Sequence, residues 1–195
     1  MLALIAIVLV QHGASLVRAH DRCRDRLGMI GQVTWLYAGD HQTSFPPDLQ
    51  TLARYGESLG VDRLLRNAMV CPVSSDSKPH SAASISDPGR CSYIYVGADL
   101  STRSNPKCIV ALDDPANHKL EGGNVLFADL HVDYFDLPTI QLILNNLNAG
   151  HNPPTTLTPT LSQSAAEKDY QTNWKPRMPQ LKSGVWHIPT TQPAK

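Results

Sequence analysis

The chain begins with an apolar run and continues in a helical pattern. Its first ten residues, MLALIAIVLV, contain no charge, and no proline interrupts residues 2–37. Beyond the run, apolar side chains recur at steps of three and four residues, which places them on one face of a helix. A single long helix is therefore predicted to about Tyr37, ended by Gly39 and the polar residues after it. The residues on its packing face are Leu16, Ala19, Cys23, Leu27, Ile30, Thr34 and Tyr37.

Past residue 40 the pattern predicts short helices and then a small sheet. The stretch FPPDLQTLARYG predicts a proline-started helix that stops at Gly56, and GVDRLLRN adds a turn or two. After a polar loop from Val70, four segments have strand composition: CSYIYVG, KCIVALDD, GGNVLFA and HVDYF. The segment DLPTIQLILNNLNAG predicts a helix capped by Asp136, with Gly150 beyond its end.

The pattern divides the chain into three parts. Residues 1–17 form the apolar start, 18–150 form the domain, and 151–195 form a tail that carries seven of the fifteen prolines with many Thr and Ser residues. This composition predicts a weakly ordered tail. Trp174 and Trp186 nevertheless indicate that part of the tail docks on the domain.

The stretch EGGNVLFADLHVDYF, residues 121–135, predicts a hairpin. With Asp129 and Leu130 as a two-residue turn, Phe127 faces Val132 across the strands. Alternation then places His131 on the more polar face, together with Asp133. The apolar face would consist of Val125, Phe127, Val132 and Tyr134.

A metal site is the alternative interpretation of the same stretch. Asp129, His131 and Asp133 alternate along the chain, so a regular strand would place all three on one side. A tight turn at Asp129 removes that regularity, and no HExxH motif accompanies it. The hairpin is therefore favoured and no metal is predicted, with Asp129 the leading candidate if one binds. A hard-cation site at Asp129 or at Asp113–Asp114 with loop carbonyls remains open.

Composition and motifs restrict the function classes further. The 17 basic and 17 acidic residues balance, so no charge excess would recruit nucleic acid. The chain contains no GxSxG nucleophile elbow, no GxGxxG motif and no phosphate loop, and no cofactor is expected. Enzymatic activity is therefore not predicted; a secreted metal-binding domain or hydrolase using Asp129, His131 and Asp133 is the alternative.

Four cysteines are disulfide candidates: Cys23, Cys71, Cys91 and Cys108. An even number suits two disulfides in an oxidising compartment, and three connectivities are possible. Their spacing lacks the CxxC pairs typical of zinc sites. Four buried free thiols are the other interpretation.

The apolar start has the composition of a membrane anchor. Ten helical residues rise about 15 Å, roughly half of a hydrocarbon core, and the segment up to Ala19 must carry Gln11 and His12. A signal peptide, a marginal anchor and an anchor whose first residues lie upstream all fit. The anchor candidates are Leu2, Leu4, Ile5, Ile7, Val8 and Leu9.

Taken in order, these segments resemble bacterial type IV pilin-like proteins, especially the pseudopilin-G-like group of type II secretion with its prepilin-type cleavage and methylation segment. The match covers about residues 2–137 and depends on the apolar start, YAGDHQTSFPP, the CP loop, YIYVG and the phrase NVLFADLHV. His118 resembles the family's histidine before the glycines. The family hairpin corresponds to Asn124, Phe127, Asp129 and His131.

The resemblance implies an α+β fold in which a long N-terminal helix packs on a small antiparallel sheet. It implies a non-enzymatic structural protein, held in the inner membrane by a single span, with its C-terminal domain exported. Other pilin-like subunits or secretion machinery would be its partners. Cys23 and Cys71 match positions at which the family often carries cysteines, so the resemblance makes them the first candidates for a bridge.

Three features depart from the family pattern. The processing motif, a glycine followed by Phe-Thr-Leu-Ile-Glu, is absent from the sequence. The usual Asp-Gly turn is Asp129-Leu130, and leucine in a left-handed conformation costs about 1–2 kcal/mol, which predicts a widened or different turn. The spacer from His118 to Asp129 is one residue longer than usual.

Overall fold

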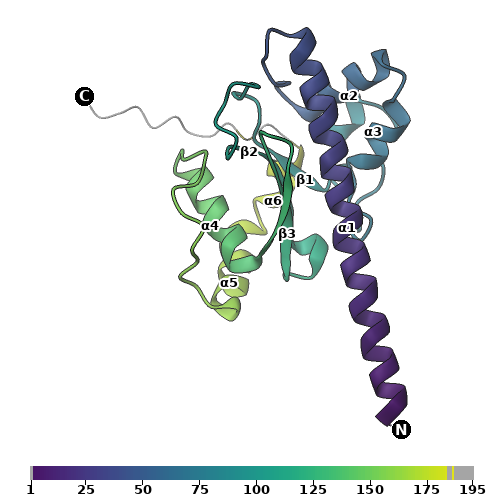
Figure 1. The fold of residues 1–195 in the computed structure, drawn as a ribbon, viewed down its shortest axis with the longest axis vertical. Helices are drawn as coiled ribbons and strands as arrows, with labels where there is room; N and C mark the ends of the chain where they lie inside the picture. Colours follow the sequence, from purple (N-terminus) through teal and green to yellow (C-terminus); the bar gives the residue numbers. More distant parts are fainter. Residues whose placement is uncertain (1, 184–185, 187–195) are drawn as a thin grey trace, which may run out of the picture.

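A four-stranded antiparallel sheet lies between two layers of helices (Figure 1). The computed structural model describes residues 2–183 and 186, with residues 2–19 described by their backbone alone. The strands follow the order β1-β2-β3-β4 and are β1 (Tyr93–Tyr95), β2 (Ile109–Asp113), β3 (Gly122–Phe127) and β4 (Val132–Asp136). The α+β class predicted from the sequence is confirmed, as is the packing of the N-terminal helix on an antiparallel sheet.

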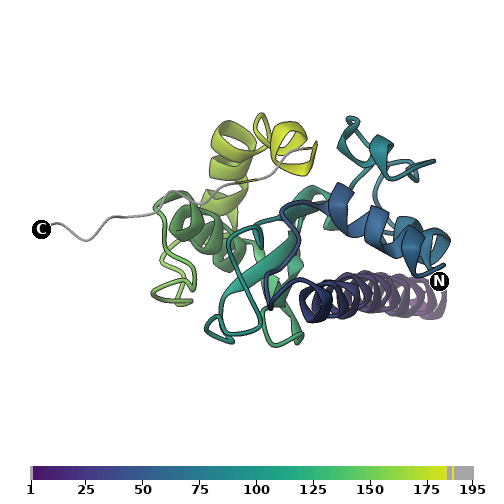
Figure 2. The same ribbon diagram turned by 90° about the horizontal axis from the view of Figure 1, so that it is seen from above.

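Helices cover both faces of the sheet, as the view from above shows (Figure 2). One layer consists of α1 (Leu2–Asp40), α2 (Leu49–Ser58) and α3 (Asp62–Ala68). The other consists of α4 (Leu137–Asn148), α5 (Gln163–Asp169), the π-helix η3 (Tyr170–Trp174) and α6 (Met178–Ser183). Two 3-10 turns, η1 (Ala83–Ser86) and η2 (Pro115–His118), lie in the connections.

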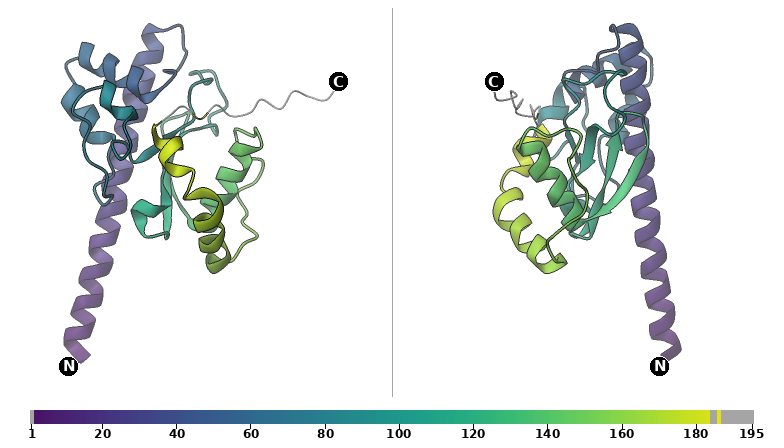
Figure 3. Two further views of the ribbon diagram at one scale, coloured as in Figure 1. Left: turned by 180° about the vertical axis from the view of Figure 1, so that it is seen from behind. Right: turned by 60° about the vertical axis from the view of Figure 1, so that its left-hand side comes forward.

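Helix α1 is one uninterrupted element of 39 residues, about 58 Å long at 1.5 Å per residue. Its second half lies against the sheet, and its first half extends beyond the domain (Figures 1 and 3). On the second half, Cys23, Leu27 and Ile30 are fully buried and Tyr37 is half-buried. The side chains of the anchor candidates between Leu2 and Leu9, and that of Leu16, lie outside the described residues.

No helix within the described residues combines the length and the apolarity needed to cross a bilayer.

Hydrogen bonds attach α1 to the domain along its second half. The Trp35 indole Nε1 donates to the Ala128 carbonyl at 2.9 Å, and the Arg26 guanidinium donates to the carbonyl of Val70. Near the other end of this contact, the Asn124 amide reaches the His20 carbonyl at 3.4 Å. The helix is therefore fixed to the hairpin tip, to the loop after α3 and to β3.

The sheet separates two hydrophobic cores. Leu126 and Val132 belong to the core beneath α1, whereas Val125 and Phe127 belong to the core beneath α4. Because successive side chains of a strand point to opposite faces, one apolar strand can supply both cores. This explains why all six residues of β3 are buried.

The hairpin register differs by one residue from the sequence prediction. Leu126 pairs with Val132 and Val125 with Asp133, because the loop has three residues and not two. The Leu130 amide donates to the Phe127 carbonyl at 3.0 Å, and Leu130 has a left-handed φ of 76°. This geometry matches a three-residue hairpin with a left-handed third residue. The expected widened turn is therefore present.

The shift in register overturns the predicted apolar face. Val132 and Tyr134 lie on the α1 side of the sheet, away from Val125 and Phe127. A one-residue slip moves a whole strand to the opposite face, so the single wrong turn length changed every pairing. On the α4 side, His131 stacks on Phe127 with ring centroids 4.2 Å apart.

Local signals in the sequence specify the ends of several helices. The Asp136 carboxylate accepts from the Thr139 amide at 3.0 Å and caps α4, as predicted. Asp48 caps α2 in the same way through the Thr51 amide at 2.5 Å. Both caps satisfy amide groups that have no partner within the helix.

The tail is structured over much of its described length, contrary to what its composition predicts. It forms α5, η3 and α6 along the face of the sheet opposite α1 (Figure 3). Trp174 and Trp186 are 3% and 8% exposed, with ring centroids 6.0 Å apart, so the expected docking of the tryptophans is confirmed. Tyr170 is fully buried in the same core. Burial of large aromatic surface outweighs the low order expected of a proline-rich and threonine-rich segment.

Two glycines of α1 provide a test of how closely the helix packs on the sheet. A methyl group on Gly31 would lie 2.9 Å from Leu126 Cδ1, whereas one on Gly28 would meet nothing within 4 Å. We expect Gly28→Ala to raise the free energy of unfolding by about 0.5–1 kcal/mol through helix propensity. Gly31→Ala should lower it by about 1 kcal/mol, because overpacking exceeds the same gain. Urea unfolding measures both, and equal effects would contradict this packing.

Candidate functional site

A disulfide joins α1 to the loop that follows α3. It links Cys23 to Cys71 with Cα atoms 5.4 Å apart, the pairing that the family resemblance suggested. Cys91 and Cys108 are buried free thiols, so neither two disulfides nor four free thiols describes this chain. Burial raises the pKa of Cys91 to about 11, which keeps this thiol protonated and unreactive at neutral pH.

Three polar side chains from the sheet and its connection meet beside this disulfide. Asp113 ends β2, His118 ends η2 and Asn124 lies in β3. One oxygen of Asp113, Oδ2, accepts from His118 Nε2 at 3.0 Å, from the Asn124 amide nitrogen at 3.0 Å and from Asn124 Nδ2 at 2.8 Å. The side chains of His118 and Asp113 are 1% and 0% exposed. The carboxylate is thus fixed by three hydrogen bonds in a fully buried position.

The short turn η2 brings His118 back to Asp113, five residues before it. Asp114 caps this turn by accepting from the Ala116 amide at 3.0 Å, and Pro115 occupies the first position of the turn. Lys119 then ends it with a left-handed φ of 55°. The capping Asp114 and the following proline are local sequence features that start the turn, and the left-handed Lys119 ends it. Together they direct the His118 side chain inward.

The two cysteines of the disulfide lie next to Asp113 and His118. We call these four residues, Cys23, Cys71, Asp113 and His118, the buried cluster. One potential ligand atom from each lies within 4.8 Å of the others. The Cys71 sulfur is 3.7 Å from His118 Nε2. The second carboxylate oxygen of Asp113, Oδ1, is buried and has no hydrogen-bond partner among the described residues.

Two aromatic side chains close the cluster on the side of α1 and β4. His20 stacks on Tyr134 with centroids 4.5 Å apart and meets the His118 ring edge-on at 4.6 Å. Burial and the neighbouring His118 lower the pKa of His20. Burial, with the negative charge of Glu121, raises the pKa of Tyr134 to about 12. Both side chains are therefore uncharged at neutral pH.

The arrangement does not have the geometry of a nucleophilic relay. In a triad, one histidine nitrogen faces the nucleophile and the other faces the carboxylate. Here His118 Nε2 faces both the Cys71 sulfur and Asp113. Cys71 is also engaged in the disulfide, and the cluster is buried, so a substrate has no direct approach to it.

The three residues considered for an exposed metal site do come together, but not around a common point. His131 stands between two carboxylates: Nδ1 contacts Asp129, and Nε2 lies 3.6 Å from Asp133. The ring therefore separates the two acids. Slight burial raises the pKa of Asp129, but hydrogen bonds from the side chain and backbone of His131 outweigh it and lower this pKa. The trio is a solvent-exposed polar cluster at the hairpin tip.

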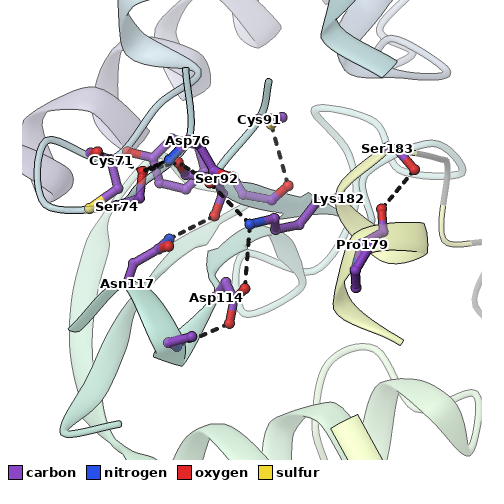
Figure 4. A network of polar contacts seen from close by, with 12 residues as sticks. Cys71, Ser74, Asp76, Cys91, Ser92, Asp114, Asn117, Pro179, Lys182 and Ser183 are labelled. Carbon is purple, nitrogen blue, oxygen red and sulfur yellow. Dashed lines mark hydrogen bonds and ion pairs between the residues drawn. The ribbon is translucent and has the colours of Figure 1, made fainter. Parts of the chain in front are cut away.

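Asp113 and Asp114, considered as a joint cation site, serve different networks. Asp113 belongs to the buried cluster, whereas Asp114 lies on the side of the tail (Figure 4). There Lys182 of α6 lies 3.5 Å from Asp114 and 3.0 Å from Asp76, and the Tyr170 hydroxyl donates to Asp114. Burial lowers the pKa of Lys182, but the charges of Asp114 and Asp76 outweigh it and raise this pKa. An ionic network thus attaches the tail to the domain.

Sequence reasoning identified parts of these networks but not their partners. The family resemblance drew attention to His118, and the acidic pair drew attention to Asp113, yet nothing in the sequence connects the two. No partner was predicted for Lys182, because one of several basic residues in a polar tail has no distinguishing pattern. Asp76 lies in a serine-rich loop that is typical of solvated surface.

No protein-family model, no curated protein and no solved structure matches this chain.

Loss of the disulfide should weaken the attachment of α1. Cys23→Ser with Cys71→Ser opens a loop closed over a sequence separation of 48, and we expect a loss of about 2–4 kcal/mol in the free energy of unfolding. Urea unfolding with and without a reductant measures this loss. A Cys91→Ala, Cys108→Ala variant is the control and should remain as sensitive to reductant as the original chain. Insensitivity of the original chain to reductant would contradict the bridge.

Removal of the buried cation should detach the tail. Lys182→Met leaves Asp76 and Asp114 with an unpaired buried charge, and we expect a loss of about 3 kcal/mol in the free energy of unfolding. Lys175→Met is the matched control. Lys175 is exposed, and its ammonium group donates a hydrogen bond to the exposed Gln171 one helical turn earlier. Tryptophan fluorescence during urea unfolding follows both variants. Equal stability of the two variants would show that the network does not hold the tail.

Proposed function

We propose that this chain is a non-enzymatic, membrane-anchored structural protein of the pilin-like or pseudopilin-like kind. The observation that carries the proposal is the form of α1. One half of this helix packs on the sheet, and the other half extends beyond the domain with the apolar sequence of residues 2–10 at its end (Figure 1). A long helix of this kind places a folded domain at a set distance from a membrane.

The attachment of α1 supports a load-bearing role for the helix. The Cys23–Cys71 disulfide, the Trp35–Ala128 hydrogen bond and the buried face around Leu27 hold it to the domain. These contacts are distributed along the second half of the helix. A force applied to the first half would therefore be transmitted to the whole sheet and not to a single side chain.

The chemistry of the described residues supports a structural role over a catalytic one. The side chains that carry chemistry, Cys71, Asp113 and His118, are buried beneath α1. The exposed group around His131 lies at a hairpin tip with its two acids on opposite ring nitrogens. The Cys23–Cys71 disulfide also suits an exported domain, since such bonds persist in oxidising compartments.

Together with the resemblance of residues 2–137 to pilin-like proteins, these features favour a single-pass inner-membrane protein with an exported C-terminal domain. Its partners would be other pilin-like subunits or secretion machinery of the type II secretion or type IV pilus kind. The helix surface that α1 leaves outside the core carries Asp21, Arg22, Arg24 and Asp25, a mixed set of charges suited to solvated or intersubunit contacts.

Removal of the apolar start tests the anchor. Deletion of residues 1–17 should release a soluble, folded domain, because the described core begins with Cys23. The full chain should sediment with membranes and resist extraction at high salt. A second variant, Ile5→Lys with Val8→Lys, keeps the length of the helix and should also leave the membrane fraction, because each buried charge costs about 2.5–3.5 kcal/mol. Membrane retention of both variants, or aggregation of the deleted form, would rule out the anchor.

A further inference from the structure

The buried cluster has the composition of a metal site once its disulfide is opened. It combines two cysteine sulfurs, an imidazole nitrogen and a carboxylate oxygen, all within 4.8 Å of one another. We propose that the reduced chain binds one Zn²⁺ tetrahedrally through Cys23, Cys71, His118 and Asp113. The proposal goes beyond the structural role above and does not depend on anchoring in a membrane.

Two of the distances in the cluster are already close to those of a zinc site. Zinc bonds of about 2.3 Å to sulfur and about 2.0–2.1 Å to nitrogen or oxygen set tetrahedral separations of about 3.8 Å between sulfurs and about 3.6 Å between sulfur and nitrogen. The Cys71 sulfur already lies 3.7 Å from His118 Nε2. His118 Nε2 and Asp113 Oδ2, now 3.0 Å apart, must separate by about 0.3 Å. Reduction frees the two sulfurs to move apart by side-chain rotation.

The surroundings supply what a zinc site needs beyond its ligands. Asn124 donates two hydrogen bonds to Asp113 and thus orients the carboxylate from outside the ligand set. The second oxygen, Asp113 Oδ1, is buried without a partner among the described residues, so a cation bound at Oδ2 would also offset the negative charge at this unsatisfied oxygen. Burial by β3 and α1 excludes water, and four protein ligands with no open position are typical of structural zinc.

The sequence spacing concealed this set. Structural zinc sites are usually recognised by short CxxC pairs, whereas Cys23 and Cys71 are separated by 48 residues. Packing of α1 on the sheet brings the first sulfur to the second, and η2 returns His118 to Asp113. The ligand set therefore exists in the folded chain alone.

Disulfide and metal site exclude each other, since both use the same two sulfurs. A dithiol reductant opens the bond by transferring two electrons and two protons to the sulfurs and is itself oxidised to a disulfide. Zinc then displaces the two thiol protons, and the His118 ring takes the tautomer protonated on Nδ1, so that Nε2 presents its lone pair to the metal. In the reverse direction a disulfide oxidant, RSSR, takes two electrons from the bound thiolates. The products are the Cys23–Cys71 bond, two RS⁻ and free Zn²⁺.

Metal titration of the full chain in mild detergent tests the proposal. The protein is reduced with a phosphine, freed of metal, and titrated with Zn²⁺ or with Co²⁺ as a spectroscopic substitute. We expect one equivalent of metal, a thiolate-to-cobalt charge-transfer band and the visible bands of tetrahedral cobalt. The oxidised chain should bind none. Oxidised glutathione should release one Zn²⁺ to a chromogenic chelator for every two thiols lost.

Variants assign the ligands. Stoichiometric binding should be lost in Cys23→Ser with Cys71→Ser, and in His118→Gln. Asn124→Ala should weaken binding by roughly 10–100-fold, as expected of a residue that orients a ligand. Two controls should bind as the original chain does: Cys91→Ala with Cys108→Ala, which removes the other thiols, and Asp129→Asn with His131→Gln, which removes the exposed cluster.

Far-UV circular dichroism is recorded in every titration, because it shows whether the reduced chain is folded. A reduced chain that is folded and binds no metal overturns the proposal. If reduction unfolds the chain, zinc should restore the native spectrum, and failure to restore it overturns the proposal equally. Binding that survives loss of Cys23 and Cys71, or that disappears in either control, assigns the metal elsewhere. Failure of this test leaves the anchor experiment unaffected, because the latter is performed on the oxidised chain.

Discussion

Contact between the second half of α1 and the sheet is the interaction on which the rest of the structure depends. Leu27 and Ile30 bury their side chains completely there, in the same core as Leu126 of β3. Burial of side chains of this size stabilises a fold by about 1.5–3 kcal/mol each. The same contact brings Cys23 to Cys71 and covers Asp113 and His118, so both the bridge and the buried cluster are consequences of how α1 packs.

Burying the polar side chains of this cluster requires removing them from water, which opposes folding. The folded state tolerates this only while every member has its partner. Asp113 satisfies one oxygen with three hydrogen bonds, and His118 takes part in one of them. Buried ionisable groups of this kind seldom add net stability over apolar side chains, but removing one partner is strongly destabilising. On the opposite side, Lys182 plays the corresponding part for Asp114 and Asp76. The consecutive residues Asp113 and Asp114 thus place two networks at the end of β2: Asp113 holds the buried cluster beneath α1, and Asp114 holds the tail.

In the hairpin, the strands were predicted correctly, but an error of one residue in the turn changed which side chains meet. Both strands, the turn at Asp129 and its widening were predicted, whereas the left-handed backbone of Leu130 was not. The count of loop residues was not predicted either, and a three-residue loop places Val132 and Tyr134 beneath α1. Strand pairing has a period of two, so an error of one residue reverses the face of every side chain after the turn.

Amino-acid sequence alone determined the local structure: the uninterrupted α1, the cap at Asp136, and strands of apolar and β-branched residues. These depend on neighbours within a few positions, where periodicity and capping act. Tertiary structure alone decided which strand faces meet which helices, which core receives Trp174 and Trp186, and that Cys71 and His118, 47 residues apart, lie side by side. Contacts over such separations result from the packing of α1 and the tail on the sheet, and local patterns do not encode them.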